Sequence, residues 1–169
     1  STIRVGYFYG ARDSEGMARA GWAGIGIALL FMSITASAMV LVPDYLLAIY
    51  IDPWAASNAA MVAFATRYLL VAAAFQLVDG VQAVAAGALR GLQDTRMPMW
   101  IAVFSYWVPG FGLAMTLGFA TPLAGVGVWI GLATGLAFAA ALLTWRWARR
   151  EALGLTRFTP EDAAIRQAP

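Results

Sequence analysis

The sequence predicts an all-α integral membrane protein with about four transmembrane helices. Hydrophobic residues make up 62% of the 169 residues and charged residues only 12%, which is too apolar for a soluble domain with a polar surface. The 17 glycines and seven tryptophans fit the same class, because small residues let helices approach closely in lipid and Trp favours the headgroup level. Four apolar runs are long enough to cross the hydrocarbon core of a bilayer, which takes roughly 20 helical residues.

The elements follow in order along the chain. Residues 1–17 are typical of the end of a preceding helix and a cytoplasmic linker, so we expect the chain to be a piece of something larger. Residues 151–169 are polar, are interrupted by Pro160 and are expected to form a cytoplasmic tail. The four spans lie between them, within 18–150, at about 18–42, 58–89, 98–120 and 123–147.

Capping residues predict the helix ends. Ser57 or Asn58 is suited to cap the second span, because a short polar side chain can accept a hydrogen bond from the first free N–H groups. Gly91 is expected to end that span in the left-handed conformation. Asp94 or Thr95 is expected to cap the third span.

Proline and glycine mark the third and fourth spans. Pro98 is tolerated in a first helical turn, whereas Pro109-Gly110 lies halfway along the third span and is expected to bend or break it. Gly127, Gly131 and Gly135 form a stripe of small residues on the fourth span, which indicates tight helix packing.

The arginines predict the orientation, because short loops rich in Arg stay in the cytoplasm. With Arg67 as the exception, the arginines fall before the first span, between the second and third, or after the fourth. We therefore expect a multi-pass protein of the inner (plasma) membrane, with residues 1–17, residues 90–97 and the C-terminal tail in the cytoplasm.

Composition excludes several kinds of chemistry. The chain has no Cys and no His, which removes disulfides, thiolate chemistry and imidazole metal ligands. The segment "LRGLQDTRMP" lacks the glycine spacing and the Lys of a phosphate-binding loop, and is predicted to be a turn. No catalytic residue, metal cluster, cofactor or nucleic-acid partner is expected, and an enzyme is disfavoured because only one carboxylate lies deep in a span.

That carboxylate is Asp79, in the run "QLVDGVQAVAAGALRGLQDT". It lies eleven residues before Arg90, about 16 Å along a helix, which places it near the bilayer midplane. A charge at this depth is costly, so such residues usually face a cavity or a partner. Either Asp79 hydrogen-bonds a neighbouring helix, or it has a functional role; a salt bridge to Arg67 is disfavoured by about 18 Å along one helix.

The chain resembles the multidrug and toxic compound extrusion (MATE) transporters. The resemblance runs from "IRVGYFYGARD" through "FQLVDGVQAVAAGALRGLQDTRMP" and "SYWVPG" to "GVGVWIGLATG", and its middle block is the most specific. Members of that family have twelve helices in two six-helix lobes. The resemblance implies that this chain is most of the C-terminal lobe, namely the end of the eighth helix and helices nine to twelve, with the N-terminal lobe as its missing partner.

The resemblance also implies a site. In many bacterial members an Asp at the place of Asp79 binds and releases the coupling cation, H⁺ or Na⁺. Phe75 stands where the family often has Tyr, which removes a hydroxyl ligand for sodium at Asp79 and leaves a cation–π face. Phe75, Asp79 and Gln82 share one helical face, expected to line the substrate cavity, with Gln76 beside them. Gln76 and Gln82 either orient a drug or the carboxylate, or make structural bonds between helices.

Three functions are consistent with these residues. The first is a cation-coupled multidrug efflux antiporter that exports organic cations by alternating access of two lobes, with membrane lipids around it. The second is a flippase for lipid-linked saccharides, which would be expected to carry more cationic residues in its cavity. The third is a non-transporting membrane scaffold, in which Asp79 has no role in coupling.

Overall fold

The computed structural model describes residues 1–156, which form helices and the turns between them. The elements are α1 (Thr2–Ala11), α2 (Ser14–Leu41), α3 (Pro43–Leu47), the 3-10 turn η1 (Ala56–Asn58), α4 (Ala59–Gly91), α5 (Arg96–Ser105), the π-helix η2 (Tyr106–Phe111), α6 (Gly112–Phe119) and α7 (Ala124–Ala148). The predicted tail lies mostly outside the described residues, including Pro160.

Four helical segments are long and apolar enough to cross a membrane: Ser14–Leu41, Ala56–Gly91, Arg96–Phe119 and Ala124–Ala148. Each overlaps one predicted span, and the chain is a multi-pass membrane protein. The first membrane-spanning helix, α2, begins at Ser14 instead of residue 18 because Asp13 caps it. The Asp13 carboxylate accepts a hydrogen bond of 2.8 Å from the Gly16 N–H.

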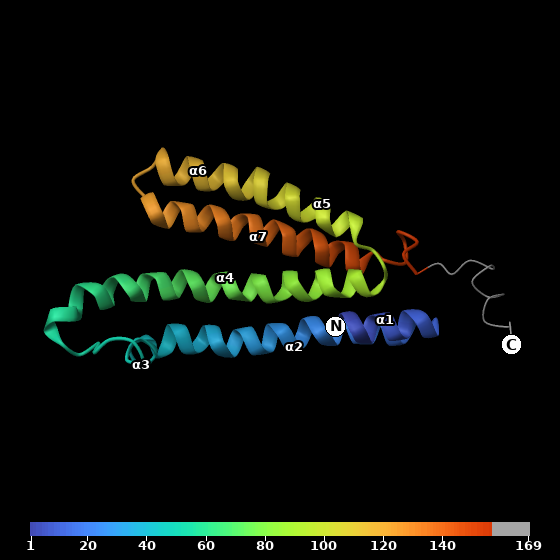
Figure 1. Ribbon diagram of the computed structural model, residues 1–169, viewed down its shortest axis with the longest axis horizontal. Coiled ribbons are helices and arrows are strands. Elements are labelled where there is room, and N and C mark those ends of the chain that lie inside the picture. Colours follow the sequence, from blue (N-terminus) through green and yellow to red (C-terminus); the bar gives the residue numbers. More distant parts are fainter. Residues whose placement is uncertain (157–169) are drawn as a thin grey trace, which may run out of the picture.

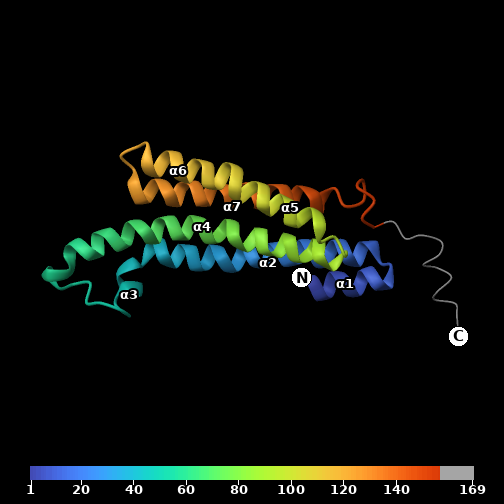
Figure 2. The same ribbon diagram turned by 45° about the horizontal axis from the view of Figure 1, so that its top comes forward.

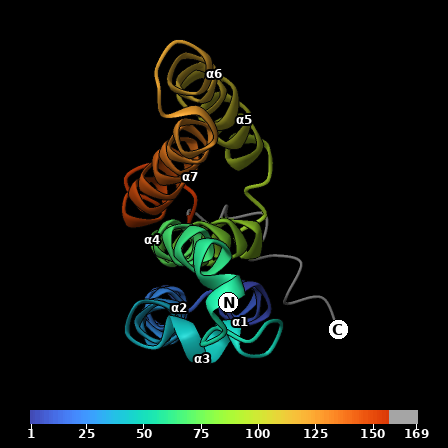
Figure 3. The ribbon, with the colours of Figure 1, turned by 90° about the vertical axis from the view of Figure 1, so that its left-hand side faces the viewer.

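The long helix α4 is the centre of the arrangement. α2 runs beside it on one side and α7 on the other, while α5 and α6 lie on the outer side of α7 (Figures 1 and 3). The short α1 packs against α2 and α4 at one end of the bundle (Figure 1). The α1–α2 linker, the α4–α5 turn and the end of α7 lie at this same end, so the three arginine-bearing segments are brought together as the orientation rule requires.

A compact core occupies that end of the bundle. Met17, Leu89 and Trp147 are fully buried within it, together with Val5 of α1. The Trp147 ring lies against Gly21 of α2 so closely that a Cβ there would collide with it. Along most of the remaining length, large apolar side chains face outward, as expected for helices solvated by lipid.

The end of α4 differs from the prediction. Gly91 is the last residue of the helix, not its left-handed cap; Gln93 instead takes the positive φ of 64°. Gly91 is required for a different reason, since a Cβ there would lie 2.8 Å from the carbonyl oxygen of Thr2. Its role is close packing against α1, which local sequence does not reveal.

The predicted side-chain caps are also wrong. Asn58 and Thr95 stand at the cap positions of α4 and α5, but neither makes a side-chain cap bond. The Asn58 amide donates to the Asp52 carbonyl at 2.8 Å, and Asp94 forms an ion pair with Arg146 of α7. A bond within the preceding loop therefore took the Asn58 side chain, and a tertiary ion pair took that of Asp94.

The third span is neither broken nor regular at Pro109. The chain stays helical, but Tyr106–Phe111 forms the π-helix η2, which accommodates the missing N–H of Pro109. Gly110 lies against Gly135 of α7, where a Cβ added to Gly110 would be 3.1 Å from the Gly135 Cα. The predicted glycine packing of the last helix is thereby confirmed, because Gly127 and Gly131 likewise face α6 closely.

Candidate functional site

Asp79 lies on an exposed face of α4, between the contacts with α2 and those with α7. We call the face that carries Phe75, Asp79 and Gln82 the Asp79 face. α4 is an uninterrupted helix of 33 residues, rich in Ala and free of proline, so these positions stay in register on one side. Asp79 makes no hydrogen bond or ion pair with any described residue.

Aromatic rings border the site on the side nearer η1. The ring of Phe75 meets Trp129 of α7 edge to face, with centroids 6.1 Å apart, and Tyr68 also meets Trp129 edge to face, at 6.4 Å. A hollow of about 260 Å³ lies next to them, lined in part by Tyr68 and Trp129. This arrangement offers ring faces and edges for a planar or cationic group.

A polar pair borders the site on the side nearer the α4–α5 turn. Gln82 and Tyr106 line the same pocket between α4 and α5. Asp79, one turn before Gln82, interacts electrostatically with the phenol of Tyr106, the first residue of η2. Gln82 and Tyr106 therefore place an amide and a hydroxyl on the side of the site nearer the α4–α5 turn.

Gln76 points elsewhere. Its side-chain amide donates to the Met32 carbonyl at 3.2 Å and to the Thr35 hydroxyl at 2.9 Å, both on α2. This is the geometry of a bond between helices, one of the two alternatives that the sequence left open. The structure thus brings Phe75, Asp79 and Gln82 together and separates Gln76 from them.

Tyr106 and Trp129 are absent from the set of residues that the sequence analysis selected. Both lie in segments that it did recognise, "SYWVPG" and "GVGVWIGLATG". Whether a residue lies near Asp79 depends on how α5, η2 and α7 pack against α4. The spacing of residues within one segment does not predict this packing. For Tyr106 the available signal was an aromatic residue three positions before Pro109 in mid-span; Trp129 had no such signal.

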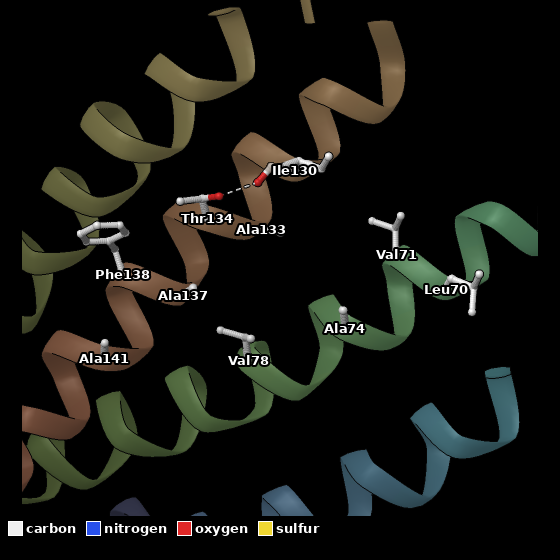
Figure 4. Close-up of a pocket in the computed structure, with 10 residues that line it drawn as sticks. All are labelled: Leu70, Val71, Ala74, Val78, Ile130, Ala133, Thr134, Ala137, Phe138 and Ala141. Carbon is white, nitrogen blue, oxygen red and sulfur yellow. Dashed lines mark hydrogen bonds between the residues drawn. The ribbon is translucent and has the colours of Figure 1, made fainter. Parts of the chain in front are cut away.

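A further groove lies away from Asp79. A groove of about 740 Å³ runs between α4 and α7 and is lined by small and aliphatic side chains with one ring, Phe138 (Figure 4). Thr134 is the polar residue among those that line it, and its hydroxyl donates to the Ile130 carbonyl at 2.8 Å. Lacking any charge, the groove can accommodate hydrocarbon but cannot select a cation.

Comparison with known proteins agrees with this architecture. The family model described as MatE matches residues 1–116. The chain is similar to a probable multidrug resistance protein NorM of Mesorhizobium japonicum, with 48% identity over 150 residues, which cover 89% of this chain and 32% of that protein. A probable NorM of Brucella suis is 44% identical over 149 residues, covering 88% of the chain and 32% of that protein.

A multidrug resistance protein NorM of Burkholderia vietnamiensis is 43% identical over 147 residues, covering 87% of the chain and 32% of that protein. The chain thus spans about a third of the length of the curated relatives that it matches. The matched segment includes α4 with Asp79 and the α5–η2 segment with Tyr106. On the family match and these identities, the chain belongs to the MatE family.

Proposed function

We propose that this chain is part of a cation-coupled multidrug efflux antiporter, in which Asp79 carries the coupling cation, a proton or a sodium ion. The observation that carries the proposal is the position of Asp79 at mid-helix, exposed on its face and unpaired among the described residues. An unpaired carboxylate in a membrane is costly, and a bound cation removes that cost. The relatives' names, multidrug resistance proteins, support an efflux function.

The surroundings of Asp79 favour an organic cation as the exported substrate. Phe75 and Trp129 present aromatic rings on one side, and the carboxylate supplies the negative charge that such rings complement. Substrate and coupling cation would then compete for one negative site, which is the simplest form of exchange. A flippase for anionic lipid-linked saccharides would need cationic groups here, where the structure has an acid.

Alternating access requires that the site open to one side of the membrane at a time. In this proposal the second wall of the cavity is supplied by the parts of the relatives that this chain does not span. The chain contributes the coupling acid and the aromatic border, and an enzymatic role is not proposed.

The test replaces Asp79 in the complete protein and measures ethidium efflux from cells that lack their own drug pumps. Asp79→Asn keeps the shape of the side chain but removes its charge, and we expect at least a tenfold loss of efflux, equivalent to about 1.4 kcal/mol. Asp79→Glu should retain part of the activity. Folding should be unaffected, because Asp79 makes no bond with a described residue.

Asp44→Asn is the matched control, since Asp44 lies in α3, away from the Asp79 face, and should leave efflux at the parental rate. Replacing sodium by choline, or abolishing the pH gradient with a protonophore, identifies the coupling ion. Parental efflux by Asp79→Asn would disprove the coupling role.

A further inference from the structure

The pocket between α4 and α5, which Gln82 and Tyr106 line at its inner end, extends to the arginine-rich end of the bundle. It has a volume of about 420 Å³ and opens between the last turns of α4 and the first half of α5. Both helices pack against α7, and Leu143 of α7 forms the buried floor of the wedge between them. Figures 1 and 2 show α5 leaving the α4–α5 turn and running back along α7 while it diverges from α4.

The mouth of this pocket carries an uncompensated positive charge. Arg90 lines it from the last turn of α4, is exposed, and makes no ion pair with any described residue. The acid nearest in sequence, Asp94, is already paired with Arg146 at 2.6 Å. The Thr95 hydroxyl also lines the mouth and makes no cap bond to α5, so it is available as a donor. These groups together suit an anion.

Apart from Gln82 and Tyr106 at its inner end, the remainder of the pocket suits hydrocarbon. Met99, Val103 and Trp107 line it along one face of α5 and η2, over eight residues or about 12 Å. They extend from the helix end toward the middle of the span, opposite the buried Ala86 of α4. Between Arg90 and the polar pair Gln82 and Tyr106, the pocket is thus cationic where the span begins and apolar along α5, the polarity of a phospholipid in the same leaflet.

We infer that this pocket binds an anionic phospholipid, with its phosphate on the Arg90 guanidinium and the Thr95 hydroxyl and an acyl chain along Met99, Val103 and Trp107. An arginine is suited to phosphate because its planar donors can bond two oxygens at once. The lipid would fill the wedge between α4 and α5. The inference does not depend on the proposed transport function.

The experiment measures lipid binding to the complete protein, purified and delipidated, by native mass spectrometry with phosphatidylglycerol or phosphatidylcholine. Phosphatidylglycerol should bind severalfold more tightly than phosphatidylcholine. Arg90→Gln should weaken the binding of phosphatidylglycerol roughly tenfold, which is the effect of losing about one charge-assisted hydrogen bond. Arg96→Gln is the matched control, because Arg96 is an exposed arginine of the same turn that does not line the pocket, and it should change binding less than twofold.

A second variant tests the acyl site without changing charge. Ala102→Trp fills the middle of the pocket and should abolish the preference for phosphatidylglycerol while Arg90 remains. Equal losses in Arg90→Gln and Arg96→Gln would overturn the inference, because they would show general attraction of the basic surface for anions. Binding of inorganic phosphate as tight as that of the lipid would overturn it too, since the acyl chain would then contribute nothing.

Discussion

Asp94 and Arg146 show how a single pair of side chains joins distant parts of the chain. They are 52 positions apart, and the Arg146 Nε donates to the Asp94 carboxylate at 2.6 Å. The side chains are only 12% and 9% exposed, so solvent screens the pair weakly. The pair connects the α4–α5 turn to the last helix at the end of the bundle where the core lies.

We predict a large coupling energy for this pair. In a double-mutant cycle with Asp94→Asn and Arg146→Gln, the interaction should amount to about 1–3 kcal/mol, because either single change leaves a poorly solvated charge. Unfolding of the protein in mixed micelles by increasing dodecyl sulfate gives the free energies. The pair Glu15 and Arg19, at 3.9 Å and 79% and 72% exposed, is the control and should couple by less than about 0.5 kcal/mol. Equal coupling energies in the two pairs would contradict the prediction that burial strengthens the Asp94–Arg146 pair.

At the scale of the helices, the closest packing is between α7 and the α6–η2 segment. Gly131 faces the backbone of Ala114, and a Cβ at Gly135 would lie 2.7 Å from the Gly110 Cα. Backbones can approach this closely only where both sides lack bulk, and dispersion between them replaces the hydrophobic effect that lipid does not provide. The π-helix at Pro109 falls in the same contact, so the irregular turn is held by glycine packing.

We predict that one methyl group is enough to disturb this contact. Gly131→Ala should destabilise the protein by about 1–3 kcal/mol, because the backbone of Ala114 cannot move aside as a flexible side chain would. Gly26→Ala is the matched control in another span: its Cβ would meet nothing within 4 Å, and the change should be neutral or stabilising by up to about 1 kcal/mol. The unfolding titration used for the ion pair measures both. A Gly131→Ala protein as stable as Gly26→Ala would refute the packing argument.

At the scale of the whole molecule, charge is separated between the two ends of the bundle. Of the eleven arginines, eight lie at one end of the bundle within the described residues: Arg4, Arg12, Arg19, Arg90, Arg96, Arg146, Arg149 and Arg150. The opposite end carries Asp44 and Asp52. The positive-inside rule predicts that the arginine-rich end faces the cytoplasm.

Single cysteines introduced into a complete protein whose other cysteines have been replaced test this orientation directly, and these 169 residues contain none to replace. Ala11→Cys, in the arginine-rich end, should react with a membrane-impermeant maleimide only after the cells are permeabilised. Ser57→Cys, at the opposite end, should react in intact cells. Both residues are exposed, so the side of the membrane on which each lies, and not its burial, decides whether it reacts. Labelling of Ala11→Cys in intact cells would reverse the predicted topology.

The span number and approximate limits were predictable from the sequence, because a bilayer demands long apolar helices whose backbone bonds are satisfied within each segment. The shared face of Phe75, Asp79 and Gln82 was predictable for the same reason, since helical periodicity alone sets it. The predictions from the sequence were wrong at the helix ends. At Gly91 and Asp94 the sequence pattern suggested local caps, whereas contacts with α1 and α7 decided what these residues do.

By itself the sequence determined the class of the protein, its four apolar helices, the acid at mid-span and the face that carries it. Tertiary structure alone decided which groups from other helices lie near that face: Trp129 meets Phe75, and Tyr106 lies near Asp79. Gln76, the immediate neighbour of Phe75 in sequence, bonds instead to α2. The physical reason is that periodicity is a property of one helix, set by its backbone. Which side chains from different helices become neighbours depends on how closely those helices approach each other. The small residues and the ion pair between the helices govern this approach.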